Sequence, residues 1–143
     1  MGKQVNDNVD QSGSFASALI ANRTVNKSIK ETADGTQIFF PYNSTNKLND
    51  GAIENYLNDV ATRLISSGER VRLTGHTDAL GSSSSNMVLG QWRADVVQNY
   101  LLKKGVSASK IIAQSKGESN PIATNKTNIG RAKNRRTELQ IIK

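Results

Sequence analysis

The sequence contains no cysteine, one histidine and one tryptophan among 143 residues, and each scarcity excludes a class of site. Without thiols the chain forms neither disulfides nor thiolate metal sites, and a single imidazole argues strongly against zinc. We therefore expect no metal and no cofactor. The seven aromatic residues are not interleaved with basic ones in the way that single-stranded nucleic acid requires.

Long apolar runs are also missing, so the sequence predicts no membrane-spanning segment. The patch 15–21 is short, is interrupted by Ser17 and has only Lys3 ahead of it, which makes a poor signal peptide. Residues 1–24 are polar, and we expect a flexible arm or linker there. Residues 25–143 are long enough for one domain with one core. We expect the chain to be a piece of a longer exported protein.

Positive charge is abundant, with a formal net charge of +7. Residues 116–143 contribute much of it, because seven Lys or Arg stand there against two Glu. Such a run is most often a solvated basic face, but an acidic partner, nucleic acid or an anionic polymer remains open.

Periodicity and turn residues predict a mixed α/β (α+β) fold. A hairpin turning at Asp34-Gly35 comes first, and a helix lies between Asp50 and Ser67. The remaining expected segments are a strand at 70–78, a loop at 79–85, a helix at 86–104, a strand at 110–116, a loop at 117–128, a short basic turn at 129–135 and a strand at 136–142. This order implies βαβ crossovers, with the helices packed on one face of a mixed sheet.

The predicted core gathers the apolar positions of these segments. Its members are Ile38, Phe40, Ile53, Leu57, Val60, Leu64, Val71, Leu73, Val97, Leu101, Ile111, Leu139 and Ile141.

The candidate functional residues lie in the segment Thr74-Gly75-His76-Thr77-Asp78 and in the helix after it. The strand ends in a carboxylate, and Arg93 falls within an apolar stripe near the start of the helix. That stripe comprises Leu89, Arg93, Val96, Val97, Tyr100, Leu101 and Lys104. A guanidinium in such a position requires a partner.

Two interpretations of Asp78 and Arg93 remain open. One is a structural salt bridge between them. The other is a solvent-accessible site in which both charges bind a ligand that carries an ammonium and a carboxylate. An amino-acid-like zwitterion fits that description.

The ordered motifs of the chain resemble the OmpA-like peptidoglycan-binding domain, the family of outer-membrane protein A C-terminal domains, peptidoglycan-associated lipoproteins and MotB. The likeness covers roughly residues 36–143. It is carried by Thr74-Gly-His-Thr-Asp78, Gly81, Asn86, Leu89, Arg93-Ala94, Gly105, Gly117, Pro121, Asn125-Lys-Thr127, Gly130-Arg-Ala132 and Asn134-Arg-Arg136.

This resemblance implies a βαβαβ-type fold after a hairpin and a binding module, not an enzyme. The implied ligand is peptidoglycan, held non-covalently at the meso-diaminopimelate of the stem peptide. Asp78 and Arg93 would hold the free end of that residue. Asn43, Asn86, Leu89 and Thr77 are the further expected ligand contacts.

The resemblance also implies a location. We expect the periplasm of a Gram-negative bacterium, with the domain linked to the outer membrane through a segment outside this sequence. The sequence leaves the oligomeric state open. Pro41-Tyr42-Asn43 and Gly90-Gln91-Trp92 depart from the usual pattern, which affects the expected affinity more than the function.

Two other functions compete with this interpretation. A nucleic-acid-binding module could use the basic C-terminal third, including Arg131, Arg135 and Arg136. A hydrolase could use His76 as the base, Asp78 as its orienting acid and one of the serines at 82–85 as the nucleophile, although no nucleophile-elbow pattern is present. Bracing of the pocket loop is the simpler role for His76.

Overall fold

The computed structural model describes residues 28–39 and 51–143. Residues Glu31–Lys143 form one compact unit. The predicted arm at 1–24, the ligand contact Asn43 and the core residue Phe40 lie outside the described residues, so the proposed division at residues 24 and 25 stays a prediction.

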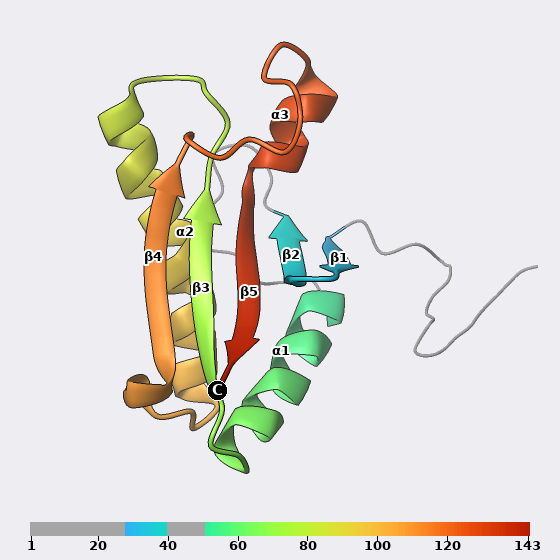
Figure 1. Ribbon diagram of the computed structural model, residues 1–143, viewed down its shortest axis with the longest axis vertical. Coiled ribbons are helices and arrows are strands. Elements are labelled where there is room, and N and C mark those ends of the chain that lie inside the picture. The colour runs from blue at the N-terminus through green and yellow to red at the C-terminus, as the bar shows by residue number, and fades with distance from the viewer. Residues whose placement is uncertain (1–27, 40–50) are drawn as a thin grey trace, which may run out of the picture. The chain divides into compact units, whose positions relative to one another are not determined.

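A five-stranded mixed sheet and its helices make up the fold (Figure 1). The strands lie in the order β1-β2-β5-β3-β4. The elements are β1 (Ile29–Thr32), β2 (Gly35–Phe39), α1 (Gly51–Ile65), β3 (Arg70–His76), α2 (Ser83–Lys103), a 3-10 turn (Ala108–Lys110), β4 (Ile111–Gly117), α3 (Asn128–Asn134) and β5 (Arg136–Ile142). The predicted order of helices and strands is confirmed.

Strand pairing explains why the sheet is mixed. β3 and β4 run parallel, as α2 between them requires, whereas β5 lies between β2 and β3 and is antiparallel to both. The last strand of the chain therefore occupies the centre of the sheet. Its first residue, Arg136, pairs with Phe39 on one side and with His76 on the other.

The two faces of the sheet differ in chemistry. Val71 and Leu73 of β3 are fully buried on the face covered by α2, while Arg72 on the opposite face donates to the side chain of Gln140. α1 packs on the helix-covered face as well, since the hydroxyl of Tyr56 donates to that of Thr36 at 2.7 Å. The expected packing of helices on one face is thus observed, and Arg72 and Gln140 lie on the opposite face.

Contact between α2 and β3 is close because two glycines face each other. A Cβ added to Gly75 would lie 1.7 Å from the carbonyl oxygen of Gly90. The glycines let the backbones approach, which places the first turns of α2 beside the end of β3. Gly90, which departs from the usual family pattern, therefore has a packing role.

The start of α2 differs from the prediction. The helix begins at Ser83, not at Asn86, so part of the predicted loop is helical. The hydroxyl of Ser82 accepts a hydrogen bond from the backbone N–H of Ser85, and this N-cap initiates the helix earlier than the apolar pattern indicated.

The buried stripe of α2 is also shifted from the predicted one. It consists of Asn86, Gly90, Arg93, Ala94, Val97 and Leu101. Leu89, Val96 and Tyr100 are half-buried, and Lys104 is exposed. Of the predicted core residues that the structure describes, Ile141 is only half-buried, because it lies near the end of β5.

Candidate functional site

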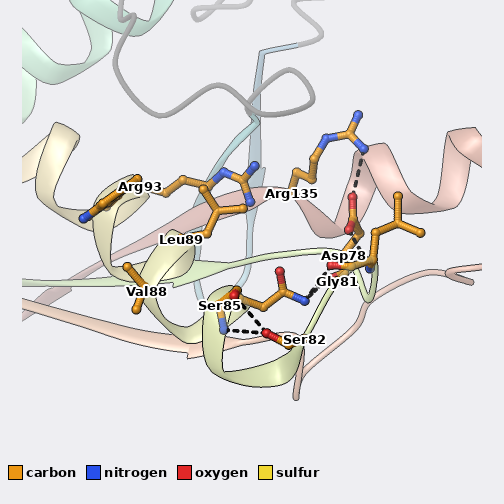
Figure 2. Close-up of a pocket in the computed structure, with 11 residues that line it drawn as sticks. Asp78, Gly81, Ser82, Ser85, Val88, Leu89, Arg93 and Arg135 are labelled. Carbon is orange, nitrogen blue, oxygen red and sulfur yellow. Dashed lines mark hydrogen bonds and ion pairs between the residues drawn. The ribbon is translucent and has the colours of Figure 1, made fainter.

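A pocket of about 530 Å³ lies where β3 ends and α2 begins (Figure 2). It is lined by Asp78, Leu80, Gly81, Ser82, Ser85, Asn86, Val88, Leu89, Trp92, Arg93 and Arg135. Four of the predicted ligand contacts, Asp78, Asn86, Leu89 and Arg93, are therefore brought together. Thr77 is not among the lining residues.

The carboxylate of Asp78 is held by two neighbours. Oδ1 accepts a hydrogen bond from the backbone N–H of Leu80 at 3.0 Å, which closes a tight turn just after β3. Oδ2 lies 3.2 Å from Nη1 of Arg135. With its side chain 7% exposed, Asp78 is a nearly buried anion whose position is set by local and distant contacts.

Arg93 lies in the wall of the same pocket and is fully buried. Its Nη1 donates to the carbonyl oxygen of His76 at 3.0 Å. Burial, and to a lesser extent the nearby positive charge of Arg135, lower the pKa of Arg93 to about 10, while the negative charge of Asp78 opposes both effects. Arg93 therefore remains a cation at neutral pH.

The arginine that forms an ion pair with Asp78 is Arg135, not Arg93. The salt bridge considered from the sequence is thus made by a different residue. Arg135 is not among the ligand contacts expected from the sequence. Two adjacent arginines in extended backbone point to opposite sides, so the pair Arg135-Arg136 indicated that one of them would face the end of the neighbouring strand. Arg135, which precedes β5 in an extended conformation, lines this pocket, while Arg136, the first residue of β5, lines another.

Asn86 shapes the loop that forms one side of the pocket. Its Nδ2 donates to the carbonyl oxygens of Asp78 at 3.2 Å and Leu80 at 2.9 Å, and to Oε1 of Glu118 at 2.7 Å. Thr77 turns its hydroxyl onto the carbonyl of Asp78 at 2.8 Å. Both residues hold the backbone around the carboxylate, and Asn86 also lines the pocket.

A hydrogen-bond relay links the C-terminal motif to this loop. Oδ1 of the fully buried Asn134 accepts from the backbone N–H groups of Ile122 and Ala123. Its Nδ2 donates to Oδ1 of Asn125, which also accepts from the N–H of Ala79 at 3.2 Å. Residues far apart in the sequence thereby position the turn that carries Asp78.

His76 faces a different part of the molecule. It is buried, it lines a separate pocket with Arg136 and Glu138, and its Nε2 lies 3.4 Å from Oε1 of Glu138. Ser82 and Ser85 line the pocket of Asp78 instead. The arrangement therefore does not support the hydrolase hypothesis, which required His76 beside Asp78 and the serines.

The nucleic-acid hypothesis also gains no support. Arg131 donates to the carbonyl of Asn125, Arg135 pairs with Asp78, and Arg136 donates to Glu138 and to two backbone carbonyls. These three arginines of the basic C-terminal third hold the fold together, and they do not form a row of phosphate contacts.

Within residues 28–39 and 51–143, no cluster of three or more histidine, aspartate or glutamate side chains is placed to hold a metal ion. No helix in the same ranges has both the length and the hydrophobicity needed to cross a bilayer.

Several known proteins are similar to this chain in sequence. Outer membrane protein A of Bordetella avium is 45% identical over 74 residues, which cover 52% of this chain and 38% of that protein. The peptidoglycan-associated lipoprotein of Buchnera aphidicola is 38% identical over 112 residues, 78% of this chain and 64% of that protein. The peptidoglycan-binding protein ArfA of Mycobacterium tuberculosis is 43% identical over 86 residues, 59% of this chain and 26% of that protein. The chain thus spans less than two thirds of each of these relatives.

Solved structures share the fold. The peptidoglycan-associated lipoprotein from Burkholderia pseudomallei superimposes with a TM-score of 0.69 at 29% identity, covering 73% of this chain and 88% of that one. The cell wall anchor of the T6SS from Pseudomonas aeruginosa gives a TM-score of 0.62 at 26% identity, over 80% and 85% of the two chains. The OmpA family model matches residues 39–135, more than half of the sequence. The chain therefore belongs to the OmpA family.

Proposed function

We propose that this protein binds peptidoglycan non-covalently through the meso-diaminopimelate of the stem peptide. The observation that carries the proposal is that Asp78 and Arg93 line one pocket. Relatives named as peptidoglycan-associated and peptidoglycan-binding proteins support the choice of polymer. Those names describe binding, and we propose no catalytic step.

The charges of the pocket match the free end of diaminopimelate. That end carries an ammonium and a carboxylate on one carbon. Asp78 attracts the ammonium, and the guanidinium groups of Arg93 and Arg135 attract the carboxylate. The pocket shields these charges from water, which strengthens their interaction with a ligand.

Side chains that do not carry charge complete the proposed site. Asn86 and Leu89 line the pocket beside the two charges. Asn43 remains a proposed contact from outside the described residues. Thr77, whose hydroxyl is bonded to the backbone of Asp78, contributes by holding the turn and is not proposed to touch the ligand.

The proposed setting is the cell envelope. Outer membrane protein A is among the relatives, which supports the periplasm and a link to the outer membrane through sequence beyond this chain. The similarity to a mycobacterial protein shows that the domain type is not restricted to Gram-negative bacteria. Fractionation of the native host, with detection by antibody, tests this placement.

Co-sedimentation with purified peptidoglycan sacculi tests the function. We expect Asp78→Asn and Arg93→Ala to reduce binding by about a hundredfold, since each removes a charge-assisted contact. Asp95→Asn on α2 and Arg63→Ala, whose guanidinium bonds Glu69 at an exposed site, are matched controls that should bind normally. If folded Asp78→Asn and Arg93→Ala sediment like the wild type, the site assignment is wrong.

A calorimetric titration tests which residue of the stem peptide the protein prefers. Calorimetry compares a tripeptide ending in meso-diaminopimelate with the same tripeptide ending in lysine, which lacks the second carboxylate. We expect the lysine peptide to bind at least ten times more weakly, because the arginines lose their anion. Equal affinities would leave peptidoglycan binding possible but would exclude selection of diaminopimelate.

A further inference from the structure

The pocket has an apolar lip formed by Leu80, Val88 and Trp92. These side chains are 48%, 52% and 56% exposed, respectively, and all three line the pocket that contains Asp78 and Arg93. Val88 and Trp92 are four residues apart on α2, so they share one side of the helix. Apolar residues on a surface are usually scattered, and their gathering at one pocket marks a contact surface.

Trp92 and Arg93 are neighbours in sequence but face different environments. Arg93 is buried in the wall, whereas the indole of Trp92 is exposed at the lip. The pocket is therefore polar and charged at one end and apolar at the other. A ligand that fills both ends has a charged group and, a short distance away, a flat apolar surface.

We infer that the apolar lip, and Trp92 above all, packs against a sugar ring of the glycan strand that carries the bound stem peptide. This inference rests on the proposed function. One face of a pyranose ring presents C–H groups and packs on aromatic surfaces, while its hydroxyl groups remain hydrated at the edge. Tryptophan provides a large rigid surface for such a contact.

The length of the stem peptide and the small size of the lip both favour a sugar over another protein as the partner. In a stem peptide two residues separate diaminopimelate from the muramic acid, and an extended chain spans about 3.5 Å per residue. These two residues span about 7 Å when extended, and the diaminopimelate side chain and the lactyl group of the muramic acid add further length, so the sugar lies outside the charged end of the pocket, where the lip stands. A stable protein interface needs roughly 20 to 30 residues on each side, far more than the three side chains of the lip.

Hydroxyl groups beside the lip fit the same ligand. Ser82 and Ser85 line the pocket, and their side chains bond one another at 2.8 Å at the start of α2. Such groups both donate and accept hydrogen bonds, as the hydroxyl and acetamido groups of peptidoglycan sugars require.

The test uses two ligands, a tripeptide ending in diaminopimelate and the same tripeptide attached to its disaccharide. Because Trp92 is the single tryptophan of the chain, intrinsic fluorescence reports directly on the lip. We expect wild-type protein to bind the disaccharide-peptide about tenfold more tightly than the peptide, with a blue shift of emission for that ligand alone.

Calorimetry of variants completes the test. Trp92→Ala should lose the tenfold advantage and bind the two ligands with about the same affinity, and Trp92→Phe should retain most of the advantage. Ile129→Ala, which removes a side chain 73% exposed on α3, is the matched control and should leave both affinities unchanged.

The possible failures are distinguishable. Equal affinity of the wild type for both ligands, or an equal loss of both in Trp92→Ala, overturns the sugar contact and leaves the proposed function intact. Failure of the wild type to bind either ligand overturns both. A dimer in sedimentation velocity that Trp92→Ala dissociates, with no change in sugar binding, would show the lip to be a protein interface instead.

Discussion

Nη1 of Arg135 lies 3.2 Å from Oδ2 of Asp78, which joins the loop after β3 to the residue that precedes β5. The pair spans 57 positions of the sequence. It exists because β5 inserts between β2 and β3, which brings the start of the last strand beside the end of β3. The position of the central strand, β5, therefore places the positive charge of Arg135 beside the carboxylate of Asp78.

Replacing Arg135 and Arg136 by alanine, one at a time, should separate their contributions to stability. Arg136 is buried and donates to Glu138 and to the carbonyls of Asn134 and Asn120, so Arg136→Ala should lower the free energy of unfolding by about 3 to 5 kcal/mol. Arg135→Ala should cost about 1 to 3 kcal/mol, since its side chain is 13% exposed and Asp78 keeps its bond from Leu80. Urea denaturation measures both, and a larger loss in Arg135→Ala would contradict these assignments.

Replacement of Gly75 should disrupt the packing of α2. In Gly75→Ala the new methyl group would lie 1.7 Å from a backbone carbonyl oxygen, so strand and helix must separate. We expect a loss of about 3 kcal/mol or more, measured by thermal and urea denaturation. Gly68→Ala is the control, because nothing lies within 4 Å of its added Cβ. A Gly75→Ala protein as stable as Gly68→Ala would show that the contact is not close.

Asn134 should stabilise the pocket from a distance. Asn134→Ala removes hydrogen bonds to Ile122, Ala123 and Asn125, and the relay to Ala79 loses its support. We expect a loss of about 2 to 4 kcal/mol together with weaker binding to sacculi. Hydrogen exchange should show faster exchange at residues 79 and 122–123. Lys133→Ala, an exposed change on the same helix, should have neither effect.

Acid should weaken the fold through Glu138. The imidazole of His76, whose Nε2 lies 3.4 Å from Oε1 of Glu138, and then the bond and charge of Arg136 lower the pKa of Glu138 from 4.5 to about 2, although desolvation opposes them. A lowered pKa stabilises the fold at pH values above 4.5, and this contribution disappears as pH falls from about 4.5 through about 2. Because the side chain is 39% exposed, we expect only about 1 to 2 kcal/mol.

Urea midpoints at several pH values measure this contribution. The difference in stability between wild type and Glu138→Gln should be largest at pH 5 to 7 and should narrow toward pH 2. A difference that stays constant over this range would show that ionisation of Glu138 is not involved.

The periodicity of apolar residues predicted most helices and strands, because these elements depend mainly on residues close in sequence. The alternation at 70–78 predicted β3, although the strand ends at His76 and Asp78 lies in the turn after it. The period of the following segment predicted α2, and β5 occupies the residues expected for it. The earlier start of α2, at Ser83, arose because a serine cap outweighed the apolar period. For Asp78 and Arg93 the sequence left a salt bridge and a shared ligand site both open, and the structure places the two residues in the lining of one pocket.

The sequence by itself therefore determined the order of helices and strands, the mixed sheet and the two charges at its edge. Only the tertiary structure decided that Arg135 is the partner of Asp78, that His76 faces away from the serines, and that Trp92 stands at the lip. These relations depend on where β5 enters the sheet and on how closely Gly75 and Gly90 let α2 approach. Contacts between distant segments arise from the packing of the whole chain, which no local period encodes.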